Sequence, residues 1–286
     1  MMTERTCTMG IAIIAIATHL GVATMTTGCK KDDGVSPDAN VTDSTTLAGW
    51  KLVWHDEFNG SAIDTSVWTF EVNGNGGGNN ELQYYTSEPR NSFVENGTLV
   101  IQALKESYNG KQYTSARMNT TYKRDWLYGR VDVRAKTPTG RGLWPAIWML
   151  PTDWVYGGWP ASGEIDIMEL LGQEPSKIYG TVHWGQDAAH HLSSGGFYTL
   201  PNGASFANGF HTFTLEWSAD SLKWFVDGIR YHDEKNGPPF DKRFHLLLNV
   251  AVGGDWPGGP DASTTFPQLM QVDYVRVYSK ASQKPE

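Results

Sequence analysis

The feature that most constrains the fold is a succession of short apolar or alternating segments that never settle into a helical period. Strands are expected where apolar and polar residues alternate, or where a short apolar run is bounded by turn residues. No stretch of the chain keeps a helical period beyond one or two turns. The predicted strands are 98–103, 128–135, 213–217, 222–228, 244–252 and 272–278. The sequence therefore predicts an all-β domain.

Two segments favour a two-sheet jelly-roll β-sandwich among the all-β folds. Segment 244–252 is an apolar run, which is typical of a strand buried in a sandwich. Segment 222–228 ends in Asp227-Gly228, a hairpin signal. The 31 glycines supply the turns that many short strands require. If one sheet is curved, its concave face forms a cleft for a chain-like ligand.

Length and charge bound the domain organisation and the partners. The 286 residues suffice for one large all-β domain and a leader, and no repeat of fixed period is present. We therefore expect a single folded domain at 49–280, a tail at 281–286 and a monomer. The net charge of −8 argues against a nucleic-acid partner, which requires a basic surface.

The N-terminus reads as an export signal. The apolar run from Ile11 to Met25 is too short for a secure membrane span and suits the h-region of a signal peptide. It ends in Thr26-Thr27-Gly28-Cys29, which resembles the lipobox of bacterial lipoproteins, although Thr26 stands where Leu is usual. That pattern implies removal of residues 1–28 and lipidation of Cys29. An ordinary secretory signal is the alternative.

The segment after the cysteine is polar, and 29–48 is predicted to be a flexible tether. Lys30-Lys31-Asp32-Asp33 resembles the charged segment of surface-exposed lipoproteins in some Gram-negative bacteria. We therefore expect a protein anchored by lipid at the bacterial envelope, with the outer cell surface as one possible location. Cys7 would leave with the leader, so the folded domain contains no disulfide.

Segment 163–169 places three carboxylates among apolar residues. Close carboxylates repel, and their burial is unfavourable unless a pKa shifts or a partner is present. Glu164 and Asp166 share a face of a strand, whereas strict alternation turns Glu169 to the other face. One extra residue in a β-bulge would return Glu169 to its partners.

Three carboxylates on one strand could also form a calcium site or lie on a solvated edge of the sheet. The nearby indoles of Trp144, Trp148, Trp154, Trp159 and Trp184 favour a sugar cleft, because calcium loops need carbonyl oxygens and turn glycines. Retaining glycosidases hold their two carboxyl groups about 5–5.5 Å apart. A bulged strand with Glu164 and Glu169 on one face suits this two-step chemistry.

Six motifs in order resemble glycoside hydrolase family 16, and within it the bacterial laminarinases, which are endo-β-1,3-glucanases. They are 54–60, 79–85, 144–151, 163–169, 180–183 and 272–278, and the resemblance extends from about Trp50 to Tyr278. The E-x-D-x-x-E form at 164–169 is the laminarinase type. Ala116 is a small departure, since relatives often have Gly there.

The resemblance implies roles for the acids. Glu164 is expected to be the nucleophile, Glu169 the general acid and then the general base, and Asp166 the residue that orients Glu164. The implied substrate is a laminarin-like β-1,3-glucan or a mixed-linkage β-glucan. No cofactor is expected for catalysis.

The resemblance also implies a substrate-binding set. Trp144, Trp148, Trp159 and Trp256 would stack on sugar rings, with plain core packing as the alternative for each. His183 would bind sugar or tune Glu169, or else be a structural histidine. Asn80 and Arg117 would contact sugar hydroxyl groups. The neighbouring His190 and His191 are expected to lie in a solvated loop, since adjacent residues of a strand point apart.

A structural Ca²⁺ is a further expectation from the resemblance. Its ligands would be the carboxylate of Asp273 and the backbone carbonyls at Glu57 and Gly97, and the ion would stabilise a sandwich without disulfides. The alternative makes Asp273 an exposed residue or a salt-bridge partner.

Three other functions stay open at this point. The same fold and acids serve hydrolases of agar, carrageenan or galactan. A sandwich can also be a non-catalytic glycan-binding protein or a structural surface protein, although neither needs the paired glutamates.

Overall fold

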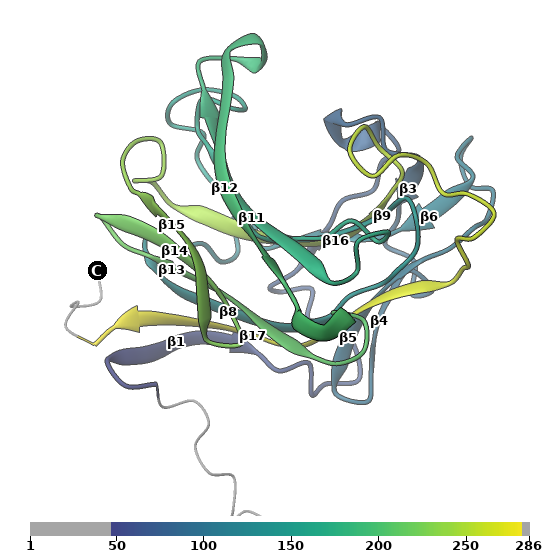
Figure 1. The fold of residues 1–286 in the computed structure, drawn as a ribbon, viewed down its shortest axis with the longest axis horizontal. Coiled ribbons are helices and arrows are strands. Elements are labelled where there is room, and N and C mark those ends of the chain that lie inside the picture. Colours follow the sequence, from purple (N-terminus) through teal and green to yellow (C-terminus); the bar gives the residue numbers. More distant parts are fainter. Residues whose placement is uncertain (1–46, 282–286) are drawn as a thin grey trace, which may run out of the picture. The chain divides into compact units, whose positions relative to one another are not determined.

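Two antiparallel β-sheets pack face to face in the computed structural model, which describes residues 47–281 (Figure 1). The predicted all-β jelly-roll sandwich is confirmed. The helices of this described part are three 3₁₀ turns of three residues each. Within 47–281, no helix has the length and apolar character needed to cross a membrane. The leader 1–28, nearly all of the tether 29–48 and most of the tail lie outside the described residues.

The first sheet has eight strands in the order β15-β14-β13-β8-β17-β5-β4, and β1 adds to β17. β17 is the longest strand and pairs with β8, β5 and β1 along its length. The hairpin predicted at Asp227-Gly228 joins β14 to β15, and both residues adopt positive φ. The strand bounds are β1 Trp50–Asp56, β4 Ser92–Glu95, β5 Thr98–Ala103, β8 Gly129–Lys136, β13 His211–Trp217, β14 Ser221–Val226, β15 Ile229–Lys235 and β17 Gln268–Lys280.

The second sheet has seven strands in the order β12-β11-β10-β9-β16-β7-β2. A short parallel pair, β3 with β6, forms a third sheet. Figure 1 shows the β11–β12 hairpin curling away from the plane of the second sheet on one side. The strand bounds are β2 Thr69–Phe70, β3 Gln83–Tyr85, β6 Tyr113–Ser115, β7 Arg117–Asn119, β9 Leu143–Pro151, β10 Glu164–Glu169, β11 Lys177–Gly185, β12 His191–Thr199 and β16 Phe244–Val252.

The strand β16 explains why one predicted segment is apolar throughout. Every residue of β16 is buried. Leu246, Leu248 and Val250 face the core between the sheets. Asn249 and Ala251 alternate with them and line a cavity on the opposite, concave face. The second sheet is therefore covered on both faces at its centre, and its concave face holds the candidate site.

Candidate active site

A β-bulge in β10 sets the geometry of the acids. Asp166 pairs with Trp148 of β9, but the next pair is Met168 with Ile147, so two residues oppose one. The pairing with β11 shifts between Asp166 and Glu169 as well. The side chains of Ile167 and Met168 both enter the core, and the strand then returns Glu169 to the concave face. The predicted bulge is confirmed.

A cavity of about 710 Å³ covers this face of the second sheet. Its lining includes all three acids and most of the residues expected to bind substrate. Asn80 is not among the lining residues, although its neighbours Asn79 and Glu81 are. The predicted site residues in the lining are Glu164, Asp166, Glu169, Trp144, Trp148, Trp159, His183, Arg117 and Trp256.

Each of the two glutamates accepts a hydrogen bond from an indole. Nε1 of Trp144 donates to Oε1 of Glu169 over 2.9 Å, and Nε1 of Trp159 donates to Oε2 of Glu164 over 2.9 Å. A hydrogen bond to a carboxylate restricts the rotamers that its side chain can adopt. These two tryptophans were expected as sugar platforms, and the structure gives each of them a contact to an acid as well.

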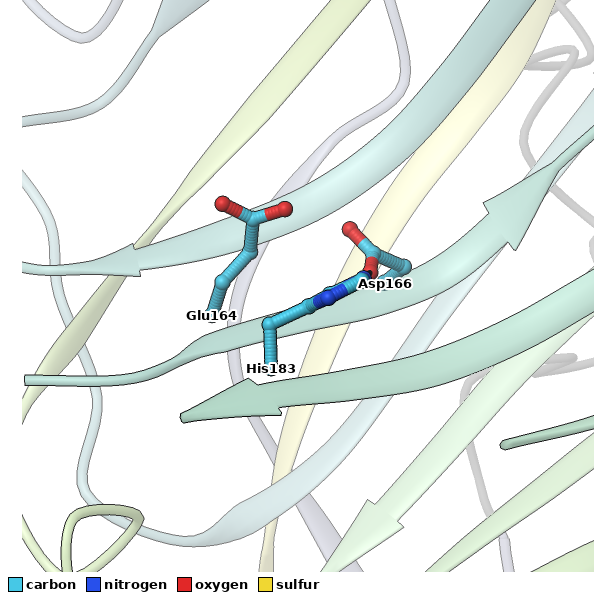
Figure 2. Close-up of side chains that lie close together, drawn as sticks. All are labelled: Glu164, Asp166 and His183. Atoms are coloured by element: carbon cyan, nitrogen blue, oxygen red, sulfur yellow. Dashed lines mark ion pairs between the residues drawn. The ribbon is translucent and has the colours of Figure 1, made fainter. Parts of the chain in front are cut away.

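His183 from β11 lies beside Asp166. Figure 2 shows Glu164 and Asp166 projecting from β10 and the imidazole of His183 reaching toward Asp166. Nε2 of His183 is 3.1 Å from Oδ2 of Asp166. Ligand-type atoms of these three residues lie within 4.8 Å of one another, a grouping of the kind that binds a metal. His183 was expected near Glu169, and its direct neighbour is Asp166.

His191 enters the cavity, contrary to the prediction of a solvated loop. Its Nε2 lies 2.8 Å from Nδ1 of His183, and the two rings stack at 5.0 Å. The ring of Trp159 lies 5.0 Å from that of His191. The preceding His190 is exposed and contacts Asp187 instead. The strand β12 begins at His191, and the two adjacent histidines point apart as expected. His191 therefore faces the cavity while His190 faces solvent.

Burial raises the pKa of all three acids. For Glu169 the pKa rises to about 8, first through burial and then through the charge of Asp166, while His183 and the Trp144 hydrogen bond oppose the rise. Burial is also the largest cause of the raised pKa of Glu164, followed by the charge of Asp166. Burial raises the pKa of Asp166 too. A cluster of this kind retains protons near neutral pH and can donate one.

A polar network lies under the floor of the cavity. Arg117 pairs with Glu71 and Glu81 and stacks between the rings of Tyr85 and Trp148, at 4.6 and 5.2 Å. The guanidinium was expected to contact sugar. It does line the cavity, but its charge is already paired with two carboxylates. Its contact with Trp148 makes it a support for that side chain.

The indole of Trp148 is held from a second direction. Its Nε1 donates to Oδ1 of Asn249 over 2.7 Å, and Asn249 in turn donates to the hydroxyl of Tyr85. Trp148 therefore presents a fixed ring to the cavity, which suits a sugar platform.

The rim of the cavity is formed in part by the loop after β16. Trp256 contacts Trp144 edge to face at 5.5 Å and Tyr179 at 4.9 Å. Asn80 donates to Asp255 next to it and is exposed. Its φ of +58° belongs to a turn that directs it to this loop. Asn80 thus links its own turn to the loop after β16 through Asp255. Sugar contact by Asn80 stays a prediction.

The residues predicted to bind calcium have other partners in the structure. Both carboxylate oxygens of Glu57 accept hydrogen bonds from Arg276, and Asp273 pairs with Arg134 over 2.5 Å. The pairing of β1 and β5 with β17 brings Glu57, Gly97 and Asp273 into one region. Asp273, the one carboxylate of the predicted donor set, is already paired with a guanidinium group, which fits the salt-bridge alternative for this residue. Calcium binding stays a prediction.

A jelly-roll sandwich whose concave face carries paired glutamates among tryptophan rings defines a glycoside hydrolase that acts on a carbohydrate chain. The match to a family model agrees. The chain belongs to glycosyl hydrolases family 16, whose model matches residues 78–276.

Relatives and solved structures agree with this membership. The chain is 45% identical to the glucan endo-1,3-beta-glucosidase A1 of Niallia circulans over 82% of its length, and spans only 38% of that protein. It is 45% identical to the beta-glucanase of Rhodothermus marinus, covering 80% of this chain and 85% of that one. The structure of endo-beta-1,3-glucanase from Pyrococcus furiosus is 47% identical, with a TM-score of 0.75, over 82% of this chain and 96% of the other.

Proposed function

We propose that this protein is a retaining endo-glycosidase that hydrolyses β-1,3-glucan of the laminarin type or mixed-linkage β-glucan. The observation that carries the proposal is the bulge in β10, which puts Glu164 and Glu169 on one face of an aromatic-lined cavity. The names of the glucanase relatives supply the substrate class. A cavity open to the surface suits a cut within a chain.

In the proposed first step Glu164 attacks the anomeric carbon and the glycosidic C–O bond breaks. Glu169 gives its proton to the departing oxygen, so no alkoxide has to leave. Its raised pKa supports this role, because a carboxyl group with a pKa of about 8 is protonated at neutral pH. Burial raises the pKa of Glu164 to about 8 as well, and each glutamate accepts an indole hydrogen bond that lowers its pKa. The assignment of Glu164 as the nucleophile therefore rests on its place in the E-x-D-x-x-E motif.

In the second step water attacks the ester that joins the sugar to Glu164. Glu169, now ionised, takes a proton from this water, and the C–O bond to Glu164 breaks. The esterification of Glu164 removes a negative charge near Glu169. The pKa of Glu169 therefore falls between the two steps, and the acid becomes a base. Two inversions give net retention of the anomeric configuration.

The test is hydrolysis of a glycan panel by the purified protein. We expect reducing ends to appear from laminarin and lichenan, with the β-anomer formed first in NMR spectra of the products. Glu164→Ser should abolish this activity, since serine cannot form the ester in this site. An α-anomer formed first, or a Glu164→Ser variant as fast as wild type, would contradict the mechanism.

The rival functions give distinct results in the same panel. A hydrolase of agar, carrageenan or galactan releases reducing ends from one of those polymers and none from laminarin. A non-catalytic binder retains laminarin in affinity electrophoresis but releases no product from any glycan.

We also propose that the protein is exported and lipid-anchored through Cys29. The apolar run before Thr26 and the polar segment after Cys29 support this location. Expression in a bacterial host should yield a protein that partitions into detergent and incorporates labelled fatty acid. Cys29→Ala should remove both properties, and an ordinary secreted protein would show neither in the wild type.

A further inference from the structure

A tryptophan of the opposite sheet reaches the catalytic bulge through the core. Trp224 lies on β14, is fully buried, and its Nε1 donates to the backbone carbonyl of Asp166 over 2.8 Å. In an uninterrupted ladder a strand carbonyl points within the sheet to the neighbouring strand. The carbonyl of Asp166 instead accepts a hydrogen bond from a side chain of the other layer, at the residue where the register shifts.

Gly180 of β11 provides the space for this contact. It lies between the pairs Asp166–Thr181 and Glu169–Tyr179, opposite the two bulged residues. A Cβ on Gly180 would clash with the indole of Trp224 and lie 2.6 Å from the Tyr231 hydroxyl. Gly180 does not have a positive φ, so the backbone conformation does not require glycine. The requirement is room for the indole.

We infer that Trp224 is a positioning residue for the general acid, with Gly180 as the opening that admits it. This rests on the proposed function, in which Glu169 is that acid. A buried carbonyl must find a donor, and Trp224 supplies one only while the bulge is present. Without the bulge, β10 would pair regularly with its neighbours. Nε1 of Trp224 would then lose its acceptor, and Glu169 would lie on the opposite face of the sheet. The hydrogen bond thus holds Glu169 in register with Glu164.

The test is Trp224→Phe, which keeps an aromatic ring in the core and removes the N–H donor. Trp217 of β13 gives a matched control, because it is equally buried and its Nε1 donates to a backbone carbonyl, that of Phe240, over 3.0 Å. Trp217→Phe removes a similar buried hydrogen bond that does not involve the bulged residues. Thermal unfolding of both variants shows how much stability each substitution removes.

Two substrates separate a misplaced acid from general damage. Laminarin needs protonation of its leaving oxygen, whereas a dinitrophenyl β-laminaribioside has a leaving group that departs without a proton. For Trp224→Phe we expect kcat/KM on laminarin to fall between about tenfold and a hundredfold, the scale of a displaced catalytic group. On the aryl glycoside kcat/KM should stay close to wild type. Trp217→Phe should change both substrates by the same factor.

A second pair of variants tests the same contact from the other side. Gly180→Ala should displace the indole and reproduce the selective loss on laminarin. Gly196, the direct partner of Gly180 in β12, provides its control, since the atoms nearest to a Cβ there belong to His232 rather than to the indole of Trp224. Gly196→Ala should lack this selectivity. If Trp224→Phe proves too unstable to assay, this pair decides the matter.

The outcomes are distinct. Equal losses on both substrates in Trp224→Phe or Gly180→Ala, or no loss on either, would overturn the inference. A wild-type protein that cleaves another polysaccharide and not laminarin would refute the proposed substrate only. The comparison would then use that polysaccharide and its matching aryl glycoside, so the role of Trp224 would still be decided.

Discussion

At the scale of single residues, the site depends on carboxylates close enough for the charge of one to raise the pKa of another. The pKa of Glu169 is raised first by burial and then by the charge of Asp166. In Asp166→Asn that charge is gone, so the pKa of Glu169 should fall and the proton needed for the first step should be lost at lower pH. We expect the alkaline limb of kcat/KM against pH to move to lower pH, together with a fall in rate.

The measurement is a pH–rate profile on laminarin. Asp255→Asn is the control, since Asp255 lies at the rim and contacts Asn80. This control should leave the alkaline limb where it is in the wild type. An alkaline limb that stays in place in Asp166→Asn would mean that Asp166 acts on Glu169 in some way other than through its charge.

His191 gives a second prediction at this scale. His191→Phe keeps a ring against Trp159 and removes the nitrogen that contacts His183. His183 then loses the partner that fixes its tautomer beside Asp166. We expect kcat to fall about fivefold, the equivalent of one hydrogen bond of roughly 1 kcal/mol, with little change in KM. The adjacent His190→Phe should behave as wild type, and equal effects in both variants would contradict this role.

The sequence predicted which acids share a face, but not what holds them. The faces of Glu164 and Asp166 follow from strand periodicity, and an extra residue brings Glu169 back. The indole of Trp159 reaches Glu164 from a loop, and His191 reaches His183 from a different strand. Such contacts depend on how loops and hairpins fold in space, for which a single sequence gives no local pattern.

At the scale of elements, the strands with a clear apolar pattern were predicted well, whereas the edge strand β12 was missed and β15 was implied only by the hairpin signal before it. The predicted segments 98–103 and 244–252 coincide with β5 and β16. β12 and β15 lie at the edges of their sheets and are largely exposed, so polar residues and glycines replace the alternation. Because β12 went unrecognised, the entry of His191 into the cleft was missed with it.

The network under the cleft floor yields a prediction on stability. Glu81 is almost fully buried, pairs with Arg117, and accepts hydrogen bonds from Gln83 and Tyr85. Glu81→Ala leaves the guanidinium with a weaker set of partners and removes a shared acceptor. We expect the free energy of unfolding to fall by about 3 kcal/mol, as for a broken buried ion pair.

Denaturant unfolding measures this loss. The exposed pair of Arg141 and Asp261 supplies the control, and Arg141→Gln, which removes the charge and leaves the Asp261 turn in place, should unfold at the wild-type midpoint. A Glu81→Ala variant with the midpoint of this control would show that the network contributes no stability.

At the scale of the whole molecule, the acid cluster opposes folding at neutral pH. The pKa of Glu169 is near its ordinary value of 4.5 in the unfolded chain and about 8 in the folded one. The folded state therefore binds this proton more tightly. Between pH 4.5 and pH 8 the unfolded chain releases it first, so the folded state loses stability as pH rises. The loss is absent below about pH 4.5 and complete above about pH 8.

Glu169→Gln should therefore be more stable than the wild type, and increasingly so with pH. At pH 4.5 the side chain is neutral in both folded proteins and only half ionised in the unfolded wild type, so the two should unfold nearly alike. At pH 8 the variant should gain roughly 2–4 kcal/mol, on the scale of 1.36 kcal/mol for each pKa unit. Urea unfolding at pH 4.5, 6 and 8 measures the difference, and Glu95→Gln at an exposed position should follow the wild type throughout. A gain that is constant or shrinks with pH would mean that Glu169 is not held protonated by the fold, and the raised pKa that makes it an acid would have to come from bound substrate.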